Sequence, residues 1–353
     1  MRAVVTVAGV AVLALGVSLS GQGKHLNPVV DLLASRTPVF GTAMPAAGGG
    51  GGGGNRGGGG AAAAGAPATP APAPAPAKTP LDLAKDALAH PDIDYFFTGG
   101  MERAVSTGRN GGPGPIVAFT DFANAFVEAG AVTKGRIRPL AAKTPNISRA
   151  DAPADPAVYI PNISAQLNAG VSIFNFVEVD NPDEISKGIA AMRFAAKGGT
   201  RPDAIGDAPK YWGLTEKEYR AKADVWPLDP NGELLAWAII ETKEGVDKVR
   251  EIAQVKGLSA VIVGAGTLGG VYATTNPDGS RGPRDNEAWE AAIQKILAAC
   301  KEFKKPCGYP AYDNDIEARM KQGFDVFIIQ TFSDRGFKAV EIGRQVSGRD
   351  KGK

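Results

Sequence analysis

The chain has 353 residues, including 46 glycines and 26 prolines, and its 39 basic and 37 acidic residues leave a formal net charge of +2. This near balance, with no basic stripe along the chain, argues against nucleic-acid binding. Only two histidines occur, His25 and His90, and they leave little room for a histidine-rich metal site. The length suffices for one large core, since a (β/α)8 barrel needs roughly 250 residues.

The first 23 residues have the layout of a secretory signal peptide, with one arginine, an apolar run and then small residues. The apolar run ends near Ser18, which is short for a membrane span, although an uncleaved anchor is the alternative. No cysteine follows directly, so a lipoprotein anchor is disfavoured. We therefore expect an exported protein, periplasmic or secreted, with no membrane attachment after cleavage.

A low-complexity tract of glycine, alanine and proline occupies residues 46–78. Such a composition cannot bury enough apolar surface to fold, which predicts disorder. A predicted strand at 39–44 precedes the tract and a predicted helix at 81–89 follows it. Because a lone N-terminal strand has no partners of its own, we expect an insertion after strand one of a single domain over residues 24–353.

Beyond the tract, predicted strands alternate with predicted helices. Helix starts carry capping signals, such as Asn181 followed by Pro182 and two acidic residues. The predicted strands are 39–44, 94–98, 136–140, 171–179, 234–242, 258–264, 307–311 and 325–330. The main predicted helices are 81–89, 121–129, 163–169, one opening at Pro182, 215–223, 245–254, 286–303, 316–322 and 335–346.

This alternation predicts a parallel sheet. Continuous apolar runs such as AVIVG and DVFIIQ indicate strands that are covered on both faces. Eight strand–helix units favour a closed (β/α)8 TIM barrel over a doubly wound sheet. Cys300 and Cys307 are the only cysteines. An oxidising compartment permits a disulfide between them, and two buried thiols are the alternative, because the local geometry decides.

In a TIM barrel, chemistry collects at the carboxyl ends of the strands, and the predicted strand 234–242 ends in Ile-Glu-Thr. The stretch IIETKEGVDKVREIAQVKGLSAVIVGAGTLGG resembles the HpcH/HpaI aldolase and citrate lyase family, whose signature is an apolar strand with this ending, a helix and a second strand. The segments PVFGTAMP, FVEVDNPDEISKGIAAMRF, KKPCGYPA and KQGFDVFII are similar to other strands of that family. The resemblance covers nearly the whole mature chain except 46–78 and 198–231.

The resemblance implies a TIM barrel that performs reversible aldol cleavage, with pyruvate or a related 2-oxo acid as the enolate-forming half. It also implies a divalent metal, Mg²⁺ or Mn²⁺, held by two carboxylates, and an arginine that helps to stabilise the developing enolate charge. Oxygen ligands suit such hard cations, and a metal with a nearby cation stabilises an oxyanion as it forms. Members of the family form oligomers, so a homo-oligomer is expected.

Residue by residue, the resemblance places Glu241 at the first metal carboxylate. The second carboxylate position falls on Thr267, whose neutral hydroxyl is a poorer ligand. The family's histidine falls near Arg103, and its strand-three arginine matches Arg138. Arg201, in GGTRPDAIG, loosely resembles the loop near the substrate carboxylate.

Two explanations account for these departures from the active-site residues of the family. In the first, Glu178 and Asp180 at the end of strand four, which strand periodicity places on one face, join Glu241 as metal ligands, and Arg103 supplies positive charge. The protein is then a metal-dependent carbon–carbon lyase acting on a 2-oxo or hydroxy acid. In the second, metal and catalysis are lost, and the exported barrel binds a small carboxylate. Strand-end acids such as Glu178 also occur as caps or solvated charges.

Overall fold

The computed structural model describes residues 25–46, 77–133, 135–149 and 152–350. The predicted signal peptide and all but the edges of the predicted disordered tract lie outside these ranges, so both remain predictions. Within the described ranges, no helix combines the length and the apolar character that a membrane crossing requires.

Eight parallel strands close into a barrel in the order β4–β3–β2–β1–β11–β10–β7–β6, and the pairing of β4 with β6 completes the ring. This architecture confirms the expected TIM barrel. The barrel strands are β1 (Val39–Ala43), β2 (Tyr95–Thr98), β3 (Leu140–Thr144), β4 (Ile173–Phe176), β6 (Leu234–Ile240), β7 (Leu258–Val263), β10 (Cys307–Tyr309) and β11 (Val326–Ile329).

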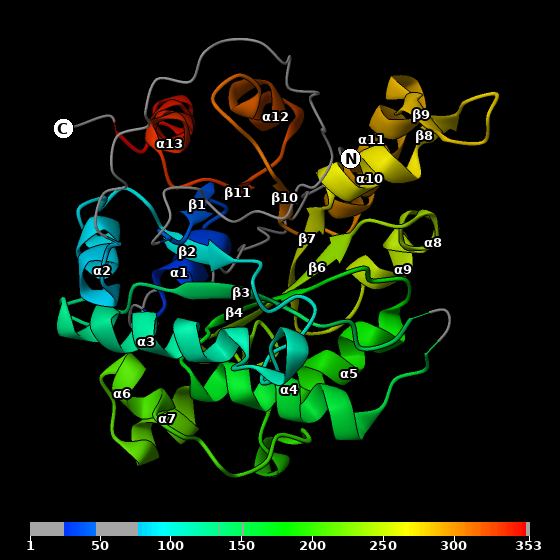
Figure 1. Ribbon diagram of the computed structural model, residues 1–353. Helices are drawn as coiled ribbons and strands as arrows, with labels where there is room; N and C mark the ends of the chain where they lie inside the picture. The colour runs from blue at the N-terminus through cyan, green and yellow to red at the C-terminus, as the bar shows by residue number, and fades with distance from the viewer. Residues whose placement is uncertain (1–24, 47–76, 134, 150–151, 351–353) are drawn as a thin grey trace, which may run out of the picture.

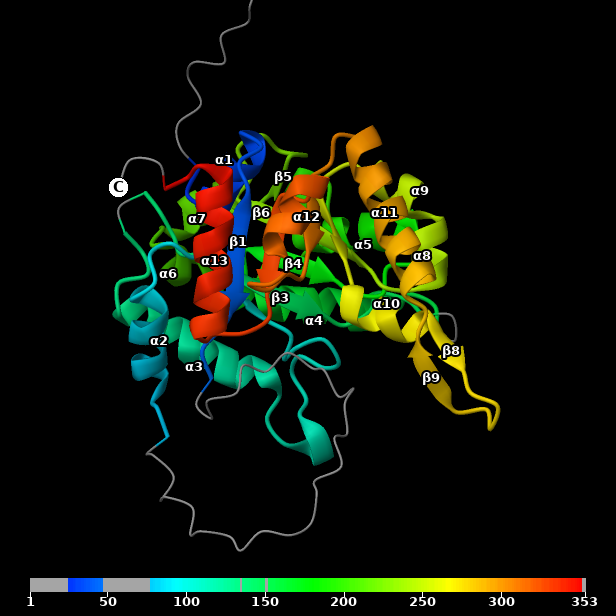
Figure 2. The ribbon, with the colours of Figure 1, turned by 90° about the horizontal axis from the view of Figure 1, so that it is seen from above.

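Helices surround this barrel, and a short hairpin of β8 (Ala273–Thr275) and β9 (Arg281–Arg284) projects away from it (Figures 1 and 2). A two-residue strand, β5 (Val225–Trp226), pairs with the start of β6. The helices are α1 (Pro28–Ala34), α2 (Pro80–Leu88), α3 (Pro115–Glu128), α4 (Pro156–Asn168), α5 (Pro182–Met192), α6 (Ala208–Trp212), α7 (Glu216–Lys222), α8 (Lys243–Asp247), α9 (Val249–Ala253), α10 (Ala265–Val271), α11 (Asn286–Glu302), α12 (Ile316–Gln322) and α13 (Asp334–Ser347).

Side-chain caps explain where many of these helices begin. Asn181 accepts hydrogen bonds from the first backbone N–H groups of α5, and Pro182 follows at a position where a missing N–H costs nothing. Thr79 and Thr215 form capping boxes at the starts of α2 and α7. The Asn181–Pro182 signal that predicted α5 therefore acts as expected.

Two apolar clusters fill the two sides of the strands, because successive side chains of a strand point to opposite faces. The inner cluster includes Tyr95, Trp237 and Ile262, and the outer cluster packs the strands against the helices. Tyr95 of β2 passes over Gly41 of β1 and donates a hydrogen bond to the Phe327 carbonyl of β11 at 2.8 Å. Apolar residues of α1 join the inner cluster, so α1 closes the amino end of the barrel (Figure 2).

Strand three lies four residues later than predicted. The sequence suggested residues 136–140, whereas β3 is Leu140–Thr144. Arg136 instead pairs with Asp31 at 2.7 Å and bonds the His25 carbonyl, so this apparent strand start is an irregular segment that anchors α1. The correction moves Arg138 out of the strand and brings Lys143 into it.

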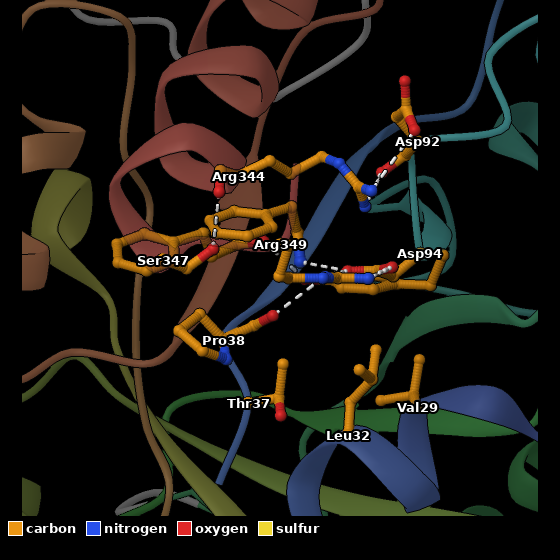
Figure 3. Close-up of polar contacts among 12 residues, drawn as sticks. Val29, Leu32, Thr37, Pro38, Asp92, Asp94, Arg344, Ser347 and Arg349 are labelled. Atoms are coloured by element: carbon orange, nitrogen blue, oxygen red, sulfur yellow. Dashed lines mark hydrogen bonds and ion pairs between the residues drawn. The ribbon is translucent and has the colours of Figure 1, made fainter. Parts of the chain in front are cut away.

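The C-terminal segment is bonded to the amino end of the barrel through Arg349 (Figure 3). Arg349 makes a two-pronged ion pair with Asp94, at 2.6 and 2.7 Å, and donates to the Pro38 carbonyl at 2.9 Å. The Asp94 side chain is only 9% exposed, and it also accepts the Phe40 N–H at 2.8 Å. This contact ties the end of the chain to the starts of β1 and β2.

A disulfide joins Cys300, in the last turn of α11, to Cys307, the first residue of β10, with 5.7 Å between their α-carbons. Of the two alternatives left open by the sequence, the structure shows the disulfide. The bond closes a short turn at the amino end of the barrel.

Candidate active site

Glu241 lies inside the barrel directly after β6. It continues the inward series of Trp237 and Ile239 and is only 2% exposed. Space for it comes from Gly264, the residue after β7, where a β-carbon would stand 2.4 Å from the Glu241 β-carbon. The barrel therefore places one buried carboxylate at its carboxyl end, as the sequence predicted for this residue.

Two groups hold the Glu241 carboxylate. The backbone N–H of Glu178 donates to its Oε1 at 3.1 Å, and the hydroxyl of Thr267 also hydrogen-bonds with it. The first comes from the loop after β4 and the second from α10, which begins just after β7. Thr267, which stands where the family resemblance expects a second carboxylate, therefore acts on the Glu241 carboxylate.

Lys143 supplies positive charge to the same region. It is the fourth residue of β3 and points inward by alternation from Ala141. Its side chain is 15% exposed, and its Nζ lies 3.0 Å from Oε2 of Glu102 in the loop after β2. Its charge also acts on Glu241. Glu102 after β2, Lys143 in β3 and Glu241 after β6 therefore lie at one end of the barrel, with β4 between β3 and β6.

Burial raises the pKa of Glu241 above that of an ordinary glutamate, and Lys143, Thr267 and the Glu178 N–H oppose that rise. Desolvation disfavours the charged form of a carboxyl group, whereas a nearby cation and hydrogen-bond donors favour it. The carboxyl group therefore takes up a proton more readily than an exposed glutamate. A group with this property can hold or release a proton during a reaction.

Glu178 contributes its backbone rather than its side chain. Its φ of 46° lies in the left-handed region, which is costly for a residue with a β-carbon. This conformation accompanies the N–H contact with Glu241, while the Glu178 carboxylate accepts a hydrogen bond from the Asn146 side chain. Strained backbone is frequent at functional sites, but the predicted role of this side chain as a metal ligand is not supported by its contacts.

Asp180 also departs from its predicted role. Its carboxylate accepts a hydrogen bond from the Thr242 hydroxyl, and its N–H donates to Glu184 at 3.3 Å. Burial raises its pKa. Among the described residues, no group of three or more His, Cys, Asp or Glu side chains is placed to hold a metal ion. The predicted set of Glu241, Glu178 and Asp180 therefore does not converge on one point.

Two predicted arginines lie at the opposite end of the barrel. Arg138 precedes β3 and donates to the carbonyls of His90 and Pro91, at 2.9 and 3.2 Å, just before β2. Arg201 is 2% exposed and donates to Tyr219 at 3.0 Å in the segment between α5 and β6. Neither reaches Glu241. Both matches relied on sequence likeness, and the shifted strand three explains the error for Arg138.

Arg103 lies in the loop after β2, at the same end of the barrel as Glu241, and it is exposed. Lys143 and Glu102 were missed by the sequence reasoning. Lys143 is the only charged residue in LAAKT, but the strand was placed before this segment, so its inward position was hidden. Glu102 precedes Arg103 in GGMER, and no pattern in the surrounding residues indicated a functional role for it.

A closed parallel barrel with an acid and a lysine at the carboxyl ends of its strands has the layout of a TIM-barrel enzyme. Residues 150–321 match the family model described as HpcH/HpaI aldolase/citrate lyase. This segment therefore matches the HpcH/HpaI aldolase/citrate lyase family, a family of aldolases and lyases, and the resemblance expected from the sequence is confirmed. No curated protein gives a significant match.

Solved structures share the fold at low sequence identity. An HpcH/HpaI aldolase/citrate lyase family protein from Burkholderia cenocepacia J2315 matches with a TM-score of 0.58 and 17% identity, over 92% of this chain and 99% of that chain. The citrate synthase SbnG matches with a TM-score of 0.53 and 16% identity, over 92% and 97%. The citrate lyase beta subunit from M. tuberculosis, complexed with oxaloacetate and magnesium, reaches only 0.41 and 12%, over 74% and 91%, which is too distant to bear on the site.

Proposed function

We propose that the protein is a carbon–carbon lyase of the aldolase type, acting on a 2-oxo or hydroxy acid at the carboxyl end of the barrel. The observation that carries this proposal is the buried carboxyl group of Glu241 at the carboxyl end of the barrel, on which the charge of Lys143 acts. The match to an aldolase and lyase family supports the class of reaction.

Cleavage of the bond next to a 2-oxo acid leaves negative charge on an enolate oxygen. A fixed cation in a partly dry site stabilises such charge as it develops, and Lys143 is such a cation. Glu102 orients its ammonium group through the 3.0 Å contact. Glu241, with its raised pKa, is positioned to take a proton from a substrate hydroxyl and return it to the enolate carbon.

The family resemblance predicts Mg²⁺ or Mn²⁺, but the donor set around Glu241 does not fit a divalent cation. The groups that act on Glu241 are the Lys143 ammonium, the Thr267 hydroxyl, the Glu178 N–H and the Glu102 carboxylate. Among the described residues no group of three or more His, Cys, Asp or Glu side chains is placed to hold a metal ion, whereas hard cations bind several carboxylate or carbonyl oxygens. We therefore assign no step to a metal, and Lys143 takes over the charge-stabilising role.

The test measures oxaloacetate decarboxylation and cleavage of a 4-hydroxy-2-oxo acid with and without a chelator. Wild-type turnover is expected to survive chelation. Lys143→Gln should lower kcat by about 10²-fold, and Glu241→Gln by about 10²-fold or more. Lys217→Gln, the same charge change on the exposed face of α7, should leave kcat unchanged.

Dependence of turnover on added Mn²⁺ would contradict the metal-free assignment. Full activity in Lys143→Gln would contradict the role of the lysine. A wild-type protein that turns over neither substrate would overturn the lyase proposal.

The second candidate function is a non-catalytic barrel that binds a small carboxylate. It is favoured by one observation, the threonine hydroxyl at the position where the family resemblance expects a second carboxylate. In that case pyruvate binds without turnover in calorimetry, and Lys143→Gln weakens binding. Export to an oxidising compartment also remains our proposal, and the Cys300–Cys307 disulfide supports it.

A further inference from the structure

A cleft of about 340 Å³ opens at the amino end of the barrel, opposite the end that holds Glu241. Arg36, just before β1, lines one side. The turn that contains Lys301, Lys304 and Lys305 lines another, and Asp325, just before β11, completes it. The Cys300–Cys307 disulfide closes that turn and so fixes the three lysines relative to the barrel. The cleft therefore gathers four cationic side chains and one carboxylate.

The positive charge of the cleft is not neutralised by salt bridges. Arg36 donates to the Lys304 carbonyl, Lys301 to the Gln322 carbonyl at 2.6 Å, and Lys305 to the Leu258 carbonyl at 2.7 Å. Within the described part of the chain, none of the four cations has an ion pair with a carboxylate. A concave surface lined by one sign of charge attracts ions of the opposite sign.

The backbone beneath two of these cations is strained. Arg36 has a φ of 55° and Lys304 a φ of 51°, and both lie in the left-handed region although neither is glycine. The two residues are joined by the hydrogen bond from the Arg36 guanidinium to the Lys304 carbonyl. Glu178, at the candidate active site, has the same kind of backbone. Such conformations are costly and concentrate where function requires a particular geometry.

Two half-buried groups show the electrostatic imbalance of the cleft. Burial and the nearby charge of Arg36 lower the pKa of Lys305. Burial raises the pKa of Asp325 to about 6, even though Arg36 acts in the opposite direction. The cations therefore repel one another here, and the one half-buried carboxylate, with its raised pKa, is a poor counterion for them.

We propose that this cleft binds a small multivalent oxyanion of the phosphate class, held by Arg36, Lys301, Lys304 and Lys305. Guanidinium and ammonium groups form strong charge-assisted hydrogen bonds with such oxygens. The volume is at the lower end of the range of ligand pockets, which suits inorganic phosphate, pyrophosphate or the phosphoryl group of a small metabolite. This site is independent of the proposed lyase reaction.

The test is calorimetric titration of the full chain in a buffer free of phosphate and sulfate, with pyrophosphate in one arm and glycerol phosphate in the other. Binding of pyrophosphate alone assigns a free inorganic anion, and binding of glycerol phosphate assigns a phosphoryl group on an organic molecule. Lys305→Gln and Arg36→Gln should each weaken binding about tenfold. Asp325→Asn, which removes the one negative charge, should tighten it severalfold.

Lys217→Gln on α7 is the matched control for net charge and should leave the affinity unchanged. Sulfate gives a second measurement, since it keeps its charge near neutral pH. Its binding should tighten below about pH 6 in the wild type, as Asp325 takes up a proton, and should change little with pH in Asp325→Asn. The other charged groups that line the cleft are Arg36, Lys301, Lys304 and Lys305.

Equal weakening in Lys217→Gln and Lys305→Gln would mean general attraction of anions by the protein surface and would overturn the proposal. Failure of both pyrophosphate and glycerol phosphate to bind, with thermal melting showing a folded protein, would overturn it as well.

Discussion

Asp325→Asn is expected to stabilise the protein at neutral pH. The Asp325 carboxylate is half-buried and receives one hydrogen bond, from the Cys307 N–H at 2.7 Å. Burial raises its pKa from 3.8 to about 6. Folding therefore favours the protonated form, so the folded state loses stability as the pH rises through this interval. The change corresponds to about 3 kcal/mol.

The asparagine variant avoids this cost, because it carries no charge and its side-chain oxygen can still accept the Cys307 N–H. The free energy of unfolding, measured by urea denaturation with the disulfide intact, should be nearly equal for the two proteins near pH 4. Near pH 7 the variant should be more stable by up to about 3 kcal/mol. Asp203→Asn, at a side chain that is 89% exposed, should show no such pH-dependent gain. A difference that stays constant with pH, or a wild type that is the more stable at neutral pH, would refute the reasoning.

Three further substitutions test other contacts. Arg349→Met leaves Asp94 buried without its cation and should lower the free energy of unfolding by about 3 kcal/mol; a loss below about 1 kcal/mol in urea would show the pair to be dispensable. Gly264→Ala pushes a methyl group to 2.4 Å from the Glu241 β-carbon, so lyase kcat should fall at least about tenfold while circular dichroism stays native. Glu178→Gln keeps the backbone N–H, so kcat should stay within about threefold; a loss as large as in Glu241→Gln would return a substrate or metal role to that side chain.

The sequence was sufficient for the architecture because each unit carries its own local signal. Caps such as Asn181 begin helices, and apolar runs such as Val326–Ile329 form buried strands. The prediction of strand three was wrong for a physical reason. RIRPL alternates like a strand, but its arginines anchor α1 and the segment before β2, whereas the true strand, LAAKT, contains two alanines with weak strand preference.

The candidate site was only partly predictable. Glu241 stands in a motif that can be recognised from sequence. The role of Glu178 depends on a backbone N–H direction and a positive φ, which arise from tertiary structure and leave no mark on residue identity. Lys143 was hidden by the misplaced strand. The Cys300–Cys307 bond likewise depends on how α11 meets β10, and spacing alone could not decide it.

The contact of Arg349 with Asp94 has a consequence for the order of synthesis. The two residues are 255 positions apart, so every residue from β2 to α13 is synthesised before the pair can form. Until then the Asp94 carboxylate, next to the starts of β1 and β2, lacks the guanidinium group that pairs with it in the folded protein. The contacts at the amino end of the barrel therefore become complete only once the segment after α13 has been synthesised.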